Sequence, residues 1–261
     1  MTELLAQILG ITQAWLLAGG VVFLRVGAAF LVLPAIGEHY IPMRIRLGAA
    51  LAMTVLLTPA LAVDLVPAGA QAQAQDFAGY VMTETIAGLL LGLAVRLVAM
   101  VLQIAGSMAA QATSLSQIAG GATPEPQPAI AGFLLLAGLT LAVMSGLHVL
   151  VARMLMESYD VLPAGRMPLA RDVGAWGVDR VGHAFALAFS LAAPFLIASV
   201  LYNLALGVIN KAMPQLMVAF VGAPAITLGG LVLLLLTTPF LLPVWMRAMQ
   251  AVLASPMGPL P

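Results

Sequence analysis

Long apolar runs dominate this chain and limit what it can fold into. Only 8% of the 261 residues are charged and 62% are hydrophobic, whereas a soluble domain has roughly 25% charged residues. Too few polar side chains are present to cover a water-exposed globule of this size. The sequence therefore predicts an all-α integral membrane protein with about six apolar helical segments. These segments are residues 4–36, 47–63, 80–102, 129–151, 182–210 and 212–246.

The lengths of these runs do not fit a set of simple membrane spans. A crossing needs roughly 20 apolar residues, because the hydrocarbon is about 30 Å thick and a helix rises about 1.5 Å per residue. Run 47–63 is short, and run 212–246 contains four prolines. Since proline removes a backbone donor and clashes with the preceding turn, we expect the last run to be broken near residues 222–224. Several of the segments should be bent or broken.

The basic residues also conflict with simple spans. If six spans start with the N-terminus outside, three basic residues fall inside and five outside, against the positive-inside preference. Four of the five lie in a predicted loop over residues 152–181. Either acidic neighbours and loop length weaken the preference, or the helices are not independent spans.

Small residues at helical spacing indicate helices packed against helices. Gly88 and Gly92 form a G-x-x-x-G pair in a row that ends on Arg96, and a second row includes Gly138 and Gly146. Small residues let helix backbones approach closely, which matters in lipid because apolar contact alone does not favour protein over acyl chains. We expect these faces to meet protein.

Motifs for catalysis or cofactor binding are absent from the sequence. His39, His148 and His183 stand outside any H-E-x-x-H pattern, and there is no G-x-S-x-G elbow. Without Cys there is no thiol chemistry, and a net charge of zero gives no basic surface for nucleic acid. We expect no enzyme activity, no cofactor and no nucleic-acid partner. His148, near the end of an apolar run, is expected to form an interfacial or interhelical hydrogen bond.

Three charged residues stand inside apolar runs: Arg25, Glu84 and Arg96. Such groups are costly in lipid and often mark ion or proton pathways. A structural ion pair or a contact with a partner subunit is the alternative, and we favour it.

Residues 103–128 are polar but almost uncharged. They contain four Gln, three Ser and two Thr, and Glu125 is their one ionisable residue. A water-exposed connection would normally carry charge. A segment that sits in a narrow passage and a tightly packed re-entrant loop both fit this composition.

Several short segments together resemble one known family. They are residues 23–28 with Pro34, 41–48, 106–111, 145–148 and 203–215 with 222–224. The pattern is similar to that of the FliR family, the flagellar member of the type III secretion export apparatus, over nearly the whole chain. We therefore expect residues 1–261 to form one FliR-like subunit. Two departures are the missing Asp-Pro after the Gly-rich region and Ala223, where the family usually has Phe.

This resemblance implies a structural subunit of a hetero-oligomeric protein export gate. Its helices would form bent hairpins around a pore in the bacterial inner membrane, at the flagellum basal body. The implied partners are FliP- and FliQ-type subunits, FlhB and FlhA, membrane lipid and unfolded export substrates. A virulence type III secretion system is an alternative setting. A secondary transporter with a broken helix near Pro224 is a less favoured alternative, since no inverted repeat is visible.

The resemblance also implies roles for particular residues. Glycines would give a pore plug hinge freedom, and closely spaced prolines would limit its conformations. The plug candidates are Gln111, Ser114, Ser116, Gln117, Gly120, Gly121, Pro124 and Pro126. The candidates for helix packing or partner contacts are Arg25, Gly88, Gly92, Arg96, Gly138, Gly146, His148, Asn203, Asn210, Pro214 and Pro224.

Overall fold

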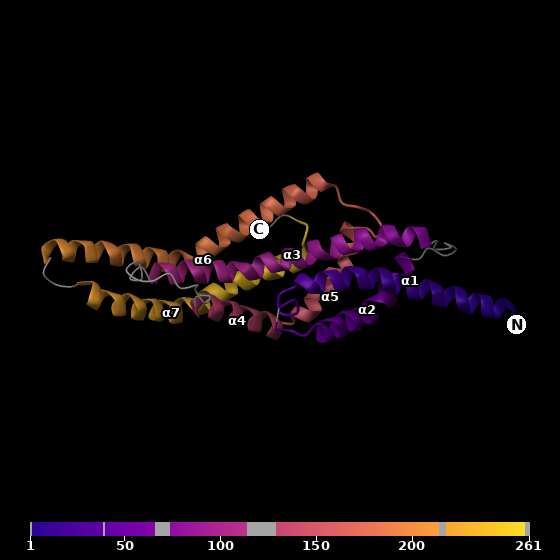
Figure 1. Ribbon diagram of the computed structural model, residues 1–261, viewed down its shortest axis with the longest axis horizontal. Coiled ribbons are helices and arrows are strands. Elements are labelled where there is room, and N and C mark those ends of the chain that lie inside the picture. Colours follow the sequence, from indigo (N-terminus) through magenta and orange to yellow (C-terminus); the bar gives the residue numbers. More distant parts are fainter. Residues whose placement is uncertain (1, 39, 66–73, 114–128, 214–217, 259–261) are drawn as a thin grey trace. The chain divides into compact units, whose positions relative to one another are not determined.

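Every regular element that the structure describes is an α-helix (Figure 1). The computed structural model describes residues 2–38, 40–65, 74–113, 129–213 and 218–258. The fold class predicted from the sequence, an all-α membrane protein, is confirmed. The helices are α1 (Thr2–Val32), α2 (Met43–Leu65), α3 (Ala74–Thr113), α4 (Ala129–Met144), α5 (Leu147–Val161), α6 (Ala170–Ala212) and α7 (Val218–Ala254).

Five of the described helices are long and apolar enough to cross a membrane, and α4 with α5 would together make a sixth. In the most apolar stretch of α3, 56% of the residues are buried within the chain, whereas in that of α7 only 11% are buried. Most of the surface of α7 is therefore left for lipid or for other protein chains. The candidate spans are Thr12–Val32, Met43–Ala62, Gly79–Thr113, Ala170–Ala212 and Ala225–Ala254.

Helix α3 is longer than predicted at its C-terminal end. The apolar run stops at residue 102, but the helix continues to Thr113 and takes in the start of the polar stretch. Residues 103–113 contain neither proline nor charge and are mostly Ala, Gln, Met and Ile, and of these Ala, Gln and Met are among the better helix formers. The end of the apolar run therefore predicts the C-terminal end of α3 too early in the sequence.

The predicted loop over residues 152–181 is wrong for most of its length. Helix α5 continues to Val161 and α6 begins at Ala170, so only residues 162–169 connect them. Apart from Arg166, which lies in this connection, the charged residues of the predicted loop lie on helices. On α5, Arg153 and Glu157 form an ion pair one turn apart, with an N–O distance of 3.2 Å. Residues at this spacing share a helix face, so α5 is an amphipathic helix.

Two predicted features of the apolar runs also differ from the structure. The run 129–151 is divided at residues 145–146, where Gly146 takes a left-handed φ of 84°. The break expected near Pro224 is wrong, because α7 runs unbroken from Val218 to Ala254. Pro59 and Pro194 likewise lie inside helices. In apolar helices, neighbouring groups and local adjustments can compensate for the missing backbone bond.

The chain forms two compact units. Unit 1 comprises Met1–Arg96, Gly146–Val178 and Gln250–Pro261. Within it α1 and α2 lie side by side (Figure 1). Its core is apolar and includes Val22, Phe30 and Leu91, all almost completely buried.

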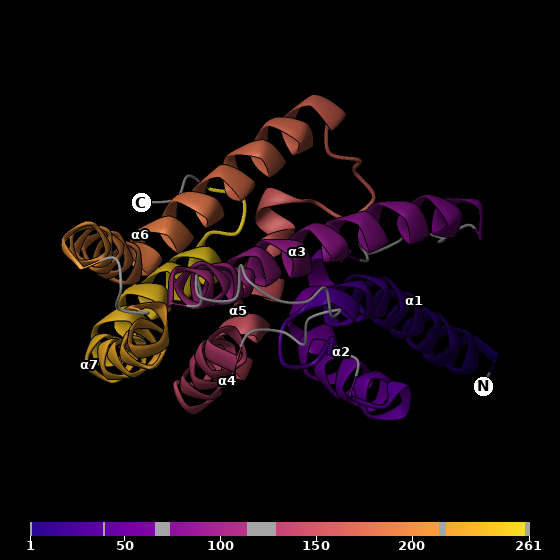
Figure 2. The same ribbon diagram turned by 60° about the vertical axis from the view of Figure 1, so that its left-hand side comes forward.

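Unit 2 comprises Leu97–Ser145 and Asp179–Met249. The C-terminal part of α6 runs beside the N-terminal part of α7 in both views (Figure 1 and Figure 2). The two helices are joined there by a hydrogen bond of 2.5 Å that Tyr202 Oη donates to the Gly222 carbonyl. At its centre the buried Trp245 donates from Nε1 to the Val98 carbonyl at 2.7 Å. A Cβ on Gly138 would overlap Leu102 and lie 3.3 Å from Trp245, so α4 packs closely here.

Candidate functional site: a buried ionic cluster in unit 1

Arg25 is the centre of a polar cluster inside unit 1. It lies on the face of α1 that also buries Val22 and Ala29, and only 1% of it is exposed. Each of its three guanidinium nitrogens donates one hydrogen bond: Nε to Glu84 Oε2 at 2.8 Å, Nη1 to Ser158 Oγ at 2.9 Å and Nη2 to the Leu162 carbonyl at 2.7 Å. The planar guanidinium suits several acceptors at fixed angles, so one side chain binds α3, α5 and the residue after α5.

Glu84 completes the pair from α3 and is fully buried. Its second oxygen, Oε1, accepts a hydrogen bond from the backbone N–H of Gly165 at 3.2 Å. Gly165 has a φ of 74°, and a Cβ there would lie 2.9 Å from the ring of Tyr80. Both the left-handed conformation and the close approach favour glycine. The carboxylate thus fixes the connection between α5 and α6.

Tyr159 covers the guanidinium from α5. The Arg25 Cζ atom lies 3.6 Å from the centre of the Tyr159 ring, a distance at which the cation is attracted to the ring face. The hydroxyl of Tyr159 is buried and has no hydrogen-bond partner among the residues that the structure describes. The ring therefore shields the ion pair without joining its hydrogen bonds.

The arrangement is suited to holding helices in place. Both charges are desolvated and each is compensated by the other and by additional hydrogen bonds, as a buried ion pair requires. Within the described part of the chain, no group of three or more His, Asp or Glu side chains could hold a metal ion. The cluster joins α1, α3, α5 and residues 162–165 at one point.

Gly88 and Gly92 extend this contact between α3 and α1. A Cβ on Gly88 would overlap the Arg25 carbonyl oxygen, and one on Gly92 would lie 2.7 Å from the Ala29 carbonyl oxygen. The predicted small-residue row is therefore the face of α3 that packs on α1. One turn further, Arg96 Nη1 donates to Glu38 Oε1 at 2.6 Å in a partly exposed ion pair.

The other predicted contact residues lie outside this cluster. His148 is exposed on α5 and forms no hydrogen bond within the described residues, and Asn210 is exposed on α6. Asn203, also exposed on α6, donates from Nδ2 to the Ser199 carbonyl of its own helix at 2.9 Å. Pro214 lies outside the described residues, and Pro224 lies within helix α7.

Among the plug candidates, only Gln111 is described. It is exposed near the end of α3. The remaining seven all lie outside the described residues: Ser114, Ser116, Gln117, Gly120, Gly121, Pro124 and Pro126.

Sequence reasoning did not find the partners that complete the cluster. Ser158 and Leu162 stand one helical turn apart, and Gly165 follows Pro163 and Ala164 in a turn-like sequence. These local signals indicate a helix end and a turn. They contain no information that the helix end meets Arg25, which lies 133 residues from Ser158 in the sequence. Nor do they indicate that the turn meets Glu84.

Comparison with known proteins gives a consistent family assignment. Residues 16–252 match the family described as bacterial export proteins, family 1. A flagellar biosynthetic protein FliR from Caulobacter vibrioides is 34% identical over 226 residues, which cover 86% of this chain and 89% of that protein. FliR proteins from Aquifex aeolicus and Escherichia coli are 27% and 26% identical over 220 and 223 residues, in each case over 84% of both chains.

Proposed function

The chain belongs to the FliR family of bacterial export proteins, and from this premise we propose that it is a structural subunit of the flagellar type III protein export gate. The observation that carries this proposal is the apolar surface that the chain leaves uncovered. Helices α6 and α7 are only 28% and 11% buried in their most apolar stretches. Long helices with such surfaces suit a subunit whose neighbours are lipid and other apolar chains.

The proposed setting is a hetero-oligomer in the bacterial inner membrane, at the flagellum basal body. Residues 1–261 act as one subunit among FliP- and FliQ-type proteins, FlhB and FlhA, and unfolded flagellar proteins pass through the assembly. The chain contributes wall and closure and performs no catalytic step. The relatives are named as flagellar proteins, which favours this setting over a virulence secretion system.

The proposed closure element is the stretch from about residue 110 to residue 127. Its first residues form the end of α3, and Gln111 is exposed there. Amide and hydroxyl side chains can form hydrogen bonds in a closed pore and exchange them with a passing chain. A charge in a dry constriction would be costly to desolvate, which accounts for a polar segment with so little charge.

Deletion of residues 114–127 tests the closure role while leaving α3 intact to Thr113. We expect the assembled complex to form and to leak ions when it is reconstituted in vesicles, because the obstruction is removed. Leakage is measured by dissipation of a potassium gradient. A control complex carries Gly and Ser in place of residues 66–73, the connection between α2 and α3, and should stay as tight as the wild type. A deletion complex that assembles and is no leakier than the control would show that this segment does not close the pore.

A further inference from the structure

The last turn of α3, in unit 2, is held by uncharged hydrogen-bond donors. The final four carbonyl groups of a helix have no partner within the helix, and in α3 they belong to residues 110–113. Basic side chains often supply such donors, but the last turn of α3 has none. Instead, Ser199 Oγ of α6 donates to the Ala112 carbonyl at 2.6 Å, and Thr113 Oγ1 donates to the Ala110 carbonyl at 3.1 Å.

The contact made by Ser199 differs from the usual contact of a helical serine. Such hydroxyls commonly bond to the preceding turn of their own helix, as Ser190 Oγ does to the Ala186 carbonyl at 2.9 Å. Ser199 is only 6% exposed and bonds to a residue 87 positions away. Asn203 Nδ2 donates to Ser199 Oγ at 3.2 Å. Because this oxygen accepts a bond from Asn203, its own hydrogen is directed to α3.

Helix α7 also contacts the end of α3. A Cβ on Gly230 would lie 2.6 Å from Thr113 Cγ2, whereas one on Gly229 would meet no described residue within 4 Å. Gly230 is buried. Glycine is a poor helix former, and the close approach of Thr113 gives a physical reason for it here. The last turn of α3 is thus fixed by α6 and by α7.

Helix α4 begins beside the same part of α3. A Cβ on Gly106 would overlap Ala131, in the first turn of α4. Gly106 precedes the end of α3 by about two turns, at about 3.6 residues a turn. The described residues on both sides of residues 114–128 are therefore anchored near the C-terminal end of α3.

We propose that Ser199, Asn203 and Gly230 are positioning residues for closure of the gate. We call these three residues the α3 anchor. Their role rests on the closure role proposed for residues 110–127, whose first four residues form the last turn of α3. The anchor lies outside that stretch and holds its beginning in one place, so the closed state depends on these contacts as well as on the stretch itself.

The first test compares two serines of α6 in reconstituted complexes. Ser199→Ala removes the donor to a buried carbonyl. We expect the potassium leak to rise about fivefold, the effect of roughly one hydrogen bond on an equilibrium between open and closed states. Ser190→Ala is the matched control, and its leak should stay within about twofold of the wild type. Native mass spectrometry checks that all complexes contain the same subunits.

The second test uses the adjacent glycines of α7 and a compensating change. Gly230→Ala should leak because its Cβ displaces Thr113, and Gly229→Ala should not. Alanine favours a helix more than glycine does, so a weaker α7 would not explain this leak. Thr113→Ser removes the methyl group that the new Cβ would meet and keeps the hydroxyl. Combined with Gly230→Ala, it should return the leak to within about twofold of the wild type.

A spin label measures the end of α3 independently of closure. The chain contains no Cys, so Gln111→Cys gives one labelling site on the exposed side of the last turn when the other subunits also lack Cys. Helix ends fray when they are not held. We therefore expect electron paramagnetic resonance to show a more mobile label with Ser199→Ala and an unchanged label with Ser190→Ala.

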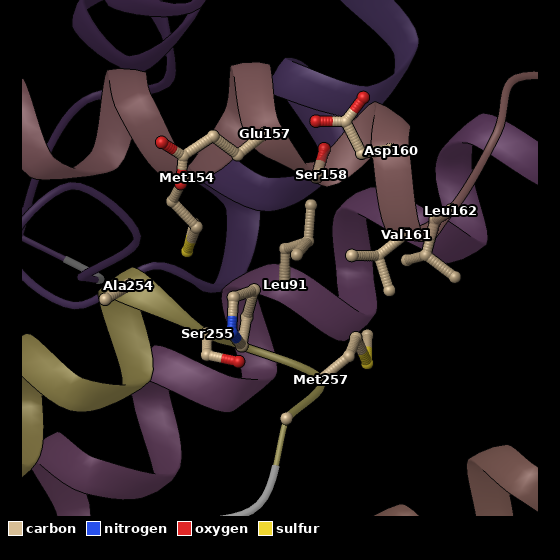
Figure 3. A pocket seen from close by; sticks show the side chains of 12 residues that line it. Leu91, Met154, Glu157, Ser158, Asp160, Val161, Leu162, Ala254, Ser255 and Met257 are labelled. Carbon is tan, nitrogen blue, oxygen red and sulfur yellow. The ribbon is translucent and has the colours of Figure 1, made fainter.

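A remote control tests whether any loosening of the chain causes a leak. Met257 lines a pocket of about 510 Å³ in unit 1, together with Leu91 of α3 (Figure 3). No residue of the α3 anchor lines this pocket. Met257→Ala should therefore change neither the leak nor the mobility of the label.

The outcomes separate the α3 anchor from the closure role. If deletion of residues 114–127 causes a leak and Ser199→Ala does not, the anchor is wrong and the closure role stands. If the deletion causes no leak, the closure role fails and positioning for closure fails with it, while the label still shows whether Ser199 holds α3. Ser199→Ala should add no leak to the deletion complex. An added leak, an unchanged label, or no recovery with Thr113→Ser would overturn the proposal.

Discussion

At the scale of single residues, Arg25 shows how a permanent charge is kept inside an apolar chain. Its guanidinium has an acceptor for each nitrogen and an aromatic ring over its face. A buried ion pair is weak evidence for net stability, because desolvation offsets much of the attraction. Removal of one partner is different, since it leaves a lone charge in the core. The pair is therefore best tested by a double-mutant cycle.

We expect Glu84→Gln to lower the free energy of unfolding by about 3 kcal/mol or more, because Arg25 loses its counter-charge in a buried site. The variant Arg25→Gln/Glu84→Gln should lose less than the sum of the two single changes. Denaturant unfolding in micelles, followed by far-UV circular dichroism, measures both. Arg153→Gln, in an exposed pair, is the control and should cost no more than about 1 kcal/mol. Strict additivity of the two changes would contradict direct coupling.

The sequence was sufficient to single out Arg25, Glu84 and Arg96 as residues that need partners. It could not pair them, because the contacts join positions 58 and 59 residues apart and no local pattern encodes such distances. The expectation that Arg25 would have a protein partner follows from the cost of a charge in lipid. Its other partners can be identified only from the packing of unit 1. They are Ser158, the Leu162 carbonyl and the ring of Tyr159.

At the scale of elements, the apolar runs predicted the presence of helices better than their ends. Helix α3 continues past its apolar run because Ala and Gln sustain a helix as well as Leu does. The charges just beyond residue 151 predict a loop, but they lie on the exposed side of α5, which continues to Val161. Prolines were the least reliable signal, since α2 and α6 contain one without ending there. The division between α4 and α5 depends instead on a glycine.

Gly146 should be more sensitive to substitution than glycines within helices. Its left-handed φ of 84° costs an L-residue with a Cβ about 1–2 kcal/mol, so we expect Gly146→Ala to lower the free energy of unfolding by that amount. Gly146→Asn should lose less, since Asn tolerates this conformation better. Gly174→Ala is the control: it lies in α6 with open space around it and should stabilise by up to about 1 kcal/mol. If Gly146→Ala unfolds at the same denaturant concentration as the wild type, the division of the run does not depend on this conformation.

At the scale of the whole molecule, the chain buries too little of its own apolar surface to stand alone in water. Large apolar side chains such as Phe185, Leu204, Leu235 and Phe240 are more than half exposed on α6 and α7. In a membrane assembly these surfaces are covered by lipid or by neighbouring subunits. Composition predicted this shortage of internal burial, but which faces remain uncovered depends on the packing of each unit.

Purification should distinguish a gate subunit from a transporter. We expect the chain to be recovered in a stable complex only when FliP- and FliQ-type proteins are co-expressed, because α6 and α7 need apolar partners. Native mass spectrometry of the detergent-solubilised complex should give a mass that includes those subunits in addition to the 26.9 kDa chain. A stable monomer or homo-oligomer of the chain alone would favour the secondary transporter.

The partners of Arg25 also set an order of events during synthesis on the ribosome. Arg25 and Glu38 emerge before α3, whereas Ser158, Leu162 and Gly165 emerge after it. Domains form from the N-terminal end as the chain is made. The charges of Glu84 and Arg96 therefore find their counter-ions on segments already synthesised, and α3 can enter the membrane with both neutralised. Ser158 and Leu162 are synthesised after both members of the Arg25–Glu84 pair, so we expect their hydrogen bonds with Arg25 to form later than that pair can form.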